Sequence, residues 1–279
     1  MTTISRMNAS DLNFAAEQTA REGWASGARD FELYLDHDPD GCFVAGEGGR
    51  RVGMVTTTRY PSSGWIGNLI VVPECRSRGV GRALMVHGIA HLEAAGVETI
   101  RLDGDPPGIP LYLSLGFADE WQSLRFRSSG AAFGAPEEVE KLEKDDIDRV
   151  ATFDRRFFGD DRARLLGLVL GTSHFAYKID EENGLRGFLV ATRSDLGLRI
   201  GPCVATDFET ARQLFSAAQA DAGGEQITVG VPEPNDEART LLAELGFEPT
   251  PPCRRMIRGP RRAENLTGGI FAIANGAVG

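Results

Sequence analysis

The run Arg76-Ser77-Arg78-Gly79-Val80-Gly81 combines residue types that bind phosphate groups. It leads from an apolar segment, expected as a strand at 64–72, straight into an expected helix at 79–96. A helix N-terminus has unpaired backbone N–H groups, glycine allows a ligand to approach closely, and arginine adds forked donors. The pattern predicts a pyrophosphate site. A tight turn with solvated arginines is the alternative that these residues leave open.

The elements around this turn must position it between a strand and a helix. In the first part of the chain we expect helices at 9–23 and 28–37 and a hairpin at 41–60 that turns at Gly48-Gly49. After the strand and helix named above, we expect a strand at 98–105, a short helix at 109–116 and a closing strand at 117–128.

The same order of elements returns in the second part of the chain. We expect helices at 146–171, a hairpin at 174–194, a strand at 198–205, a helix at 207–223, a strand at 226–233, a helix at 236–246 and a closing strand at 247–259. The segments LYLSLGF (111–117) and LLAELGF (241–247) anchor the repeat. A small, polar stretch predicts a linker at about 128–137, and hence two domains, 1–130 and 131–279.

Two motifs together resemble those of the GNAT N-acetyltransferases. R-x-x-G-x-G after the strand, from Arg76 to Gly81, resembles the family's acetyl-CoA-binding motif, and Tyr112 in LYxxLGF resembles its second signature. The resemblance covers residues 1–130 well, and the second half resembles a diverged GNAT domain. It implies an α+β fold with two tandem GNAT-like domains. Each would have a mixed, mostly antiparallel central sheet flanked by helices, in three α/β/α layers.

The resemblance also implies roles for individual residues. Backbone N–H groups from Arg76 to Ala83 would hold the CoA pyrophosphate, and the strand Leu69–Val71 would pair with pantetheine. The Leu69 N–H would polarise the thioester carbonyl. Tyr112 would protonate the departing thiolate, since a phenol with a pKa of about 10 is protonated at neutral pH. The residues expected at the acetyl-CoA site are Leu69, Ile70, Val71, Arg76, Ser77, Arg78, Gly79, Val80, Gly81, Arg82, Ala83, Asp105 and Tyr112.

The chain departs from the family pattern where a general base is often found. Many members have an acidic residue or histidine on the strand before the phosphate turn, whereas this chain has Trp65, Gly67 and Asn68. A water chain, or an amine that arrives neutral, would serve instead. Asp105 stands where the family often has asparagine, and Cys75 precedes the motif.

The second half lacks the corresponding chemistry. Its turn, CVATDFETARQ, has no glycine and places Asp207 and Glu209 where a phosphate would lie, and Leu242 is the counterpart of Tyr112. Carboxylates repel phosphate and leucine has no proton to donate, so we expect this half neither to bind acetyl-CoA nor to catalyse. It would stabilise the first half or wall off the acceptor.

Three further residues are candidates for contact with the acceptor. Trp24 falls in the helix-to-loop segment where GNAT proteins gather acceptor residues, and Phe158 and Asp161 place a ring and a carboxylate close together in sequence. An aromatic ring with a carboxylate suits an amine. Core packing of Trp24, and an ordinary amphipathic helix with an N-cap aspartate, are the alternatives.

Composition limits the partners. A net charge of −10 argues against nucleic acid. No segment approaches the roughly 20 apolar residues of a membrane helix, and the N-terminus has no apolar signal core, so we expect a cytoplasmic protein with no membrane partner. The four histidines form no ligand cluster, because His87 and His91 lack a third ligand, and we expect no metal. A monomer or a homodimer is expected.

These features favour an enzyme. It would transfer acetyl from acetyl-CoA to a primary amine of a small molecule, by direct attack in a ternary complex, because no activated Cys or Ser–His pair is apparent. The alternative is a non-catalytic acyl-CoA-binding sensor or scaffold, which would not need Tyr112. A third hypothesis resembles the mycothiol synthases, tandem GNAT proteins with an active second half, but that half is the degenerate one here.

Overall fold

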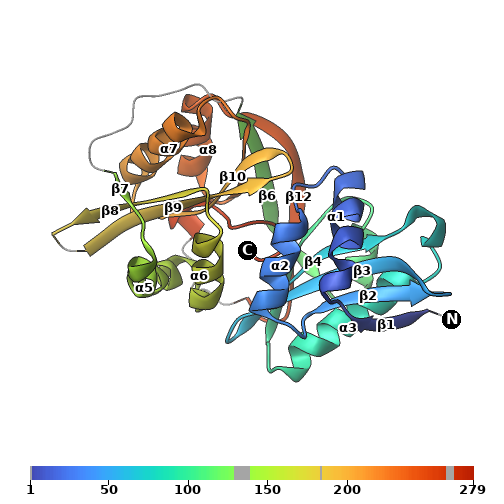
Figure 1. Ribbon diagram of the computed structural model, residues 1–279. Helices are drawn as coiled ribbons and strands as arrows, with labels where there is room; N and C mark the ends of the chain where they lie inside the picture. The colour runs from blue at the N-terminus through green and yellow to red at the C-terminus, as the bar shows by residue number, and fades with distance from the viewer. Residues whose placement is uncertain (1, 129–138, 183, 262–266) are drawn as a thin grey trace. The chain divides into compact units, whose positions relative to one another are not determined.

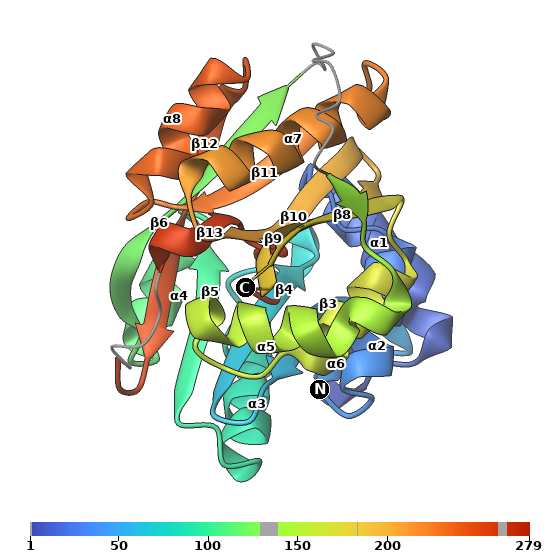
Figure 2. The same cartoon turned by 90° about the vertical axis from the view of Figure 1, so that its left-hand side faces the viewer.

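The computed structural model describes residues 2–128, 139–182, 184–261 and 267–279, which divide into two compact units (Figure 1, Figure 2). Unit 1 comprises Met1–Glu120, Arg255–Arg261 and Ala277–Gly279. Unit 2 comprises Trp121–Arg254 and Arg262–Gly276. The units therefore differ in composition from the two halves of the sequence. The division at residue 130 stays a prediction for the repeat, and the predicted linker lies outside the described residues except for Ser128, which ends a strand.

Unit 1 has a mixed sheet with helices on both faces. Its elements are β1 (Thr3–Arg6), η1 (Ala9–Asp11), α1 (Leu12–Arg21), α2 (Ala28–His37), β2 (Cys42–Glu47), β3 (Arg50–Arg59), β4 (Ser63–Val71), η2 (Pro73–Cys75), α3 (Val80–Ala94), β5 (Thr99–Gly104), α4 (Ile109–Ser114), and parts of β6 (Ala118–Ser128) and β12 (Glu248–Arg258). The strands run in the order β1-β2-β3-β4-β5-β12. Pairing is antiparallel from β1 to β4 and parallel between β4 and β5. Figure 1 shows α1 and α2 on one face of this sheet and α3 on the other.

Local sequence accounts for most of unit 1. The expected hairpin is confirmed, and it turns at Gly48 and Gly49, both with positive φ, a conformation that glycine adopts without steric cost. The helix expected at 28–37 is confirmed at both ends. Strand β1 was not expected, because three of its four residues are exposed at a sheet edge and the segment has no strong apolar alternation.

Unit 2 repeats the architecture. Its elements are β7 (Glu140–Lys141), η3 (Lys144–Asp146), α5 (Ile147–Phe158), α6 (Ala163–Gly171), β8 (Phe175–Glu181), β9 (Gly184–Ser194), β10 (Gly197–Ala205), α7 (Phe208–Ala222), β11 (Ile227–Pro232), α8 (Asp236–Glu244), η4 (Thr267–Gly269) and β13 (Ile270–Ala272), with the rest of β6 and β12. The strand order is β6-β11-β10-β9-β8-β7, and β13 pairs with β10. Figure 1 shows α7 and α8 on one face and α5 and α6 on the other. The α+β fold, with a mostly antiparallel central sheet flanked by helices, is confirmed.

Each unit contains a strand segment from the other half of the sequence. Met256 of β12 is fully buried in the apolar core of unit 1. Leu124 and Phe126 of β6 pack against the core of unit 2, and residues 123–128 pair with β11. Because the two expected closing strands complete each other's unit, neither half of the sequence contains all of its own core.

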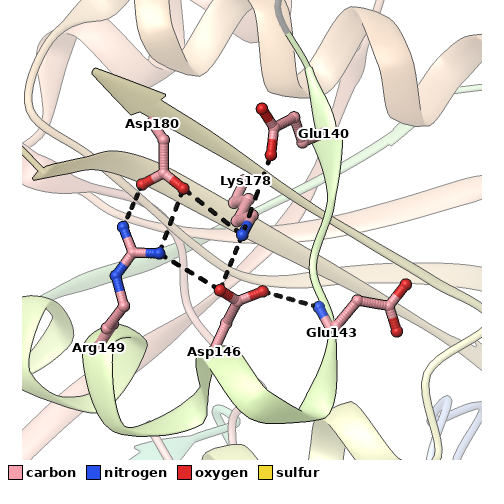
Figure 3. A network of polar contacts seen from close by, with 6 residues as sticks. All are labelled: Glu140, Glu143, Asp146, Arg149, Lys178 and Asp180. Atoms are coloured by element: carbon pink, nitrogen blue, oxygen red, sulfur yellow. Dashed lines mark hydrogen bonds and ion pairs between the residues drawn. The ribbon is translucent and has the colours of Figure 1, made fainter. Parts of the chain in front are cut away.

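A network of charged side chains ties the start of α5 to β8 in unit 2 (Figure 3). Lys178 Nζ lies 2.7 Å from Asp146 Oδ1 and 3.5 Å from Asp180 Oδ2. Arg149 bridges the same two carboxylates, with Nη2 2.5 Å from Asp180 Oδ1. Burial raises the pKa of Asp146, but hydrogen bonds from Lys178 and the Glu143 backbone outweigh it and hold that pKa below its usual value.

The network makes stability depend on pH in a defined direction. Since the folded pKa of Asp146 is depressed, its contribution is complete above its unfolded pKa of about 4 and is lost as pH falls through the folded value. We expect Lys178→Met to lower the free energy of unfolding by about 1 kcal/mol near neutral pH, and by less at about pH 3. Urea unfolding at both pH values measures this. Lys141→Met, at an exposed position on β7, is the matched control. An equal loss at both pH values would contradict the assignment.

Candidate active site

Strand β4 contains a bulge at the position where the sequence predicts thioester binding. Thr56 of β3 pairs with Gly67, but Met54 pairs with Ile70, so two residues of β4, Asn68 and Leu69, face a single residue of β3. Asn68 has a φ of 51°, and its buried side chain donates a hydrogen bond to Thr56 Oγ1 at 3.0 Å. A bulge leaves its extra residue outside the ladder. The backbone around Leu69 is therefore released from regular pairing.

The two parallel strands of unit 1 part just before this bulge. Ser63, Gly64 and Trp65 pair with Thr99, Ile100 and Arg101, and the pairing recorded for these fully described strands ends there. Strand β4 nevertheless continues to Val71 and β5 to Gly104. Residues 66–71 therefore have an edge that is not hydrogen-bonded to β5. Such an edge can accept an extended ligand as an added strand.

The phosphate turn has the backbone of an anion-binding site. Ser77 and Gly79 have φ values of 60° and 85°, and Gly79 is the N-cap of α3 without any side-chain cap. A Cβ at Gly81 would make only ordinary contacts, the nearest at 3.5 Å, so packing within the chain does not require glycine there. An uncapped helix start with open space above it matches the need of a phosphate.

Two of the eight N–H groups expected to bind pyrophosphate are already bonded. The Arg76 N–H donates to Pro73 O at 3.2 Å, and the Ala83 N–H donates to Gly79 O at 3.0 Å. The six residues between them, 77–82, remain the candidates, because the first turn of a helix has no internal acceptor for its N–H groups.

The arginines of the turn are held by neighbouring side chains. Arg76 pairs with Glu22, and Arg78 Nη2 lies 3.0 Å from Glu47 Oε2. Arg82 Nη1 donates to Ser114 Oγ at 2.9 Å, which links the start of α3 to the helix that carries Tyr112. Each of the three guanidinium groups is thereby held by a side chain from another part of unit 1.

Tyr112 is buried in the core of unit 1, on α4. Its ring packs edge-on against Phe117, with ring centroids 6.3 Å apart. A Cβ at Gly108 would lie 2.7 Å from the Tyr112 hydroxyl oxygen, and one at Gly104 would lie 2.9 Å from the ring. Two glycines in the preceding strand and loop thus make room for the phenol. Asp105 lies between them and its carbonyl accepts from the Gly108 N–H at 2.9 Å.

The three expected acceptor residues do not lie in one unit. Trp24 is half-buried in the loop between α1 and α2 of unit 1, and its backbone N–H donates to Thr19 O at 2.9 Å. Phe158 and Asp161 belong to unit 2. Asp161 accepts a hydrogen bond from the Ala163 backbone N–H at 2.9 Å, but the N-cap residue of α6 is Arg162 and not an aspartate.

Phe158 covers a buried ion pair. The Arg162 guanidinium carbon lies 4.1 Å from the centre of the Phe158 ring, and Arg162 also makes a two-pronged contact with Asp154, at 2.7 and 2.8 Å. The side chains of Arg162 and Asp154 are each only 1% exposed. Packing on this pair accounts for the ring, so we do not carry Phe158 or Asp161 into the proposed mechanism.

The matching turn of unit 2 is closed by its own side chains. Asp207 caps α7, accepting from the Thr210 N–H at 2.9 Å, and pairs with Arg186. Partial burial raises the pKa of Asp207, but these hydrogen bonds have the larger effect and keep that pKa well below its usual range. Leu242 is fully buried, and Asn235 caps α8 at 2.9 Å. A carboxylate thus occupies the helix end that is open in unit 1.

Sequence reasoning missed the residues that reach β4 from the end of the chain. Val278 O accepts a hydrogen bond from the Tyr60 hydroxyl at 2.6 Å. Arg255 stacks on Trp65, 4.2 Å from the ring, and pairs with Asp103. These contacts join positions about 150–220 residues apart, and no local sequence pattern predicts them.

Among the described residues, no group of three or more His, Cys, Asp or Glu could hold a metal. In the described part of the chain, none of the helices is long and apolar enough to span a membrane.

Family models match both halves of the chain. A model of the acetyltransferase (GNAT) family matches residues 11–117, and a model of an acetyltransferase (GNAT) domain matches residues 150–272.

One curated relative matches most of the chain, and one solved structure matches all of it. A holothin acyltransferase from Pseudoalteromonas sp. (strain SANK 73390) is 27% identical over 247 residues, which cover 87% of this chain and 83% of that protein. A mycothiol acetyltransferase from Thermobispora bispora is 38% identical over 90 residues, 29% of this chain and 30% of that protein. The crystal structure of a putative acetyltransferase from Pyrococcus horikoshii has a TM-score of 0.87 and 25% identity, and the match covers 100% of this chain and 96% of that one.

The fold, the turn and these matches place the chain among the GNAT acetyltransferases. It is a tandem GNAT protein and an acyltransferase, and its relatives support acyl transfer to an amine.

If Arg162 and Asp154 form a structural ion pair, breaking the pair should lower the free energy of unfolding. We expect Arg162→Met to lower the free energy of unfolding by about 3–5 kcal/mol, because Asp154 would remain buried without a partner. Denaturant unfolding measures this loss, with Arg155→Met as the control, because Arg155 is exposed and lies on α5, the helix that contains Asp154. A loss no larger than that of the control would mean that the pair does not support α5 and α6.

Proposed function

We propose that unit 1 binds acetyl-CoA and transfers its acetyl group to a primary amine of a small molecule, by direct attack in a ternary complex. The observation that carries the proposal is the contrast between the two helix starts. Helix α3 begins at Gly79 with no side-chain cap, whereas α7 is capped by the carboxylate of Asp207. The same fold thus has one helix end open to an anion and one that already holds one.

The pyrophosphate would lie on the backbone N–H groups of residues 77–82. Their number and the positive φ of Ser77 and Gly79 match a concave anion site. The pantetheine arm would lie along the released edge of β4, from Leu69 to Val71, as an added strand. This places the thioester at the bulge, beside the Leu69 N–H.

Each residue of the site would then have one chemical task. The amine nitrogen attacks the carbonyl carbon, and the Leu69 N–H donates to the carbonyl oxygen as negative charge develops there. The carbon–sulfur bond breaks, and the Tyr112 hydroxyl gives its proton to the sulfur. The amine loses a proton to water, and Tyr112 is reprotonated from solvent. No side chain is assigned as general base.

Two of the four cysteines, Cys42 and Cys203, are poorly suited to form a covalent acetyl-enzyme. Burial, helped by the charge of Asp38, raises the pKa of Cys42 to about 12. Complete burial raises the pKa of Cys203 as well. Thiols that stay protonated are poor nucleophiles.

The names of two relatives, holothin acyltransferase and mycothiol acetyltransferase, favour a small-molecule acceptor. The second unit would not bind acetyl-CoA, because Asp207 and Glu209 surround its helix start and Leu242 replaces the tyrosine.

A charge placed at the start of α3 tests the binding of acetyl-CoA. Gly79→Glu puts a carboxylate at the open end of α3, and we expect the Kd for acetyl-CoA to rise at least about a hundredfold, by charge repulsion and loss of N–H access. Gly96→Glu is a matched control, because Gly96 follows the other end of α3 with a φ of 80° and open space around it. Titration calorimetry measures both. Equal effects of the two variants would refute the phosphate site.

The second prediction concerns chemistry. We expect Tyr112→Phe to lower kcat about ten- to a hundredfold while the KM for acetyl-CoA changes little, because only proton donation is lost. Thiol release with a panel of primary amines measures turnover. Tyr177→Phe is the control, since that hydroxyl bonds Asp221 in unit 2. If wild type binds acetyl-CoA but no amine gives turnover, the sensor alternative is favoured.

A further inference from the structure

The segment Ala277–Gly279 is seated on β4 and belongs to unit 1. The Tyr60 hydroxyl donates to Val278 O at 2.6 Å in a buried hydrogen bond. A Cβ built on Gly67 would lie 2.4 Å from Ala277 Cβ and 2.6 Å from its Cα. A Cβ on Gly279 would lie 2.5 Å from Cζ2 of Trp65. The fit therefore depends on the absence of side chains at residues 67 and 279.

The segment covers the face of β4 opposite α3. Successive residues of a strand point to opposite faces. A Cβ at Gly64 would meet Leu92 of α3 at 2.9 Å, so Gly64 faces that helix. Trp65 and Gly67 face the opposite way, toward Ala277–Gly279. Trp65 is the last β4 residue paired with β5, and Gly67 directly precedes the bulge.

On this face of β4, the side chain of Trp65 is also held in place by Arg255. Trp65 is 2% exposed and lies under the guanidinium of Arg255, 4.2 Å away. Arg255 is held by Asp103 of β5, and both side chains are almost fully buried. The indole is therefore held between Arg255 and the last residues of the chain, and it cannot swing aside without breaking a buried pair.

We propose that Ala277–Gly279 form a wall of the acceptor site and limit the size of the amine that unit 1 accepts. The inference rests on the proposed function, because it takes the Leu69 N–H as the place of the thioester oxygen. An amine that attacks there must pass the residues just before the bulge. Ala277 occupies the space next to Gly67 on that face, so a bulky substituent next to the amine would meet the segment there.

The test uses ligands that need no knowledge of the natural acceptor. CoA joined through its sulfur to an acetamide, CoA-S-CH2-CO-NH-R, places R where the amine would be. We choose methyl, benzyl and 4-phenylbenzyl as R and measure each Kd by calorimetry on the full chain. In wild type we expect 4-phenylbenzyl to bind about tenfold more weakly than methyl, because the wall excludes it.

Two variants loosen the wall. Gly67→Ala displaces Ala277, and Tyr60→Phe removes the hydrogen bond to Val278 while keeping the ring. Either should reduce the 4-phenylbenzyl penalty at least about threefold, with the Kd for acetyl-CoA unchanged. Gly64→Ala is the matched control, since it adds the same methyl group to the same strand on the α3 face. Tyr60→Phe decides the matter if Gly67→Ala does not fold.

The outcomes are distinguishable. Penalties that are equal in wild type, Tyr60→Phe, Gly67→Ala and Gly64→Ala would overturn the wall and leave the acetyl-CoA site intact. The absence of a size penalty in wild type would also overturn it. If wild type binds neither acetyl-CoA nor any of the three analogues, the proposed function fails and this inference fails with it.

Discussion

The unpaired N–H groups at the start of α3 are the feature on which the site depends. A helix in water must satisfy its first N–H groups with a side-chain cap, solvent or a ligand. This helix begins at a glycine with a φ of 85°, and no side chain caps it. The arginines around the turn are held by contacts with Glu22, Glu47 and Ser114. The open start of α3 is the feature on which the proposed pyrophosphate site relies.

In the second unit, the corresponding helix start is capped by a side chain of the chain itself. Its helix α7 starts with Asp207, whose carboxylate binds the Thr210 N–H and also pairs with Arg186. The buried position that corresponds to the tyrosine is filled by Leu242. These changes satisfy the helix and the core internally. The start of α7 is therefore capped from within unit 2, whereas the start of α3 in unit 1 has no side-chain cap.

The exchange of closing strands gives the second half a structural role. Met256 fills the core of unit 1, and Arg255 fixes Trp65 and Asp103 beside the β4–β5 junction. The last residues of the chain then reach the same strand through Tyr60 and Gly67. The strand expected to position the thioester is therefore supported by residues from the far end of the sequence. Loss of the second half would remove part of the first unit's core.

The sequence by itself determined most of the helices and strands and the turn before α3, but not the short strands β1, β7 and β13. Alternation, helical periodicity and paired glycines are local signals, and the hairpin at 42–59, helix α3 and the open start at Gly79 could all be predicted from them. Tertiary structure alone decided which strand completes which unit, that Phe158 packs on Arg162, and that Ala277–Gly279 cover Gly67. The physical reason is that these contacts join residues distant in sequence through shape and burial. Such contacts leave no periodic trace in the chain, whereas a helix start or a turn is fixed by the few residues that form it.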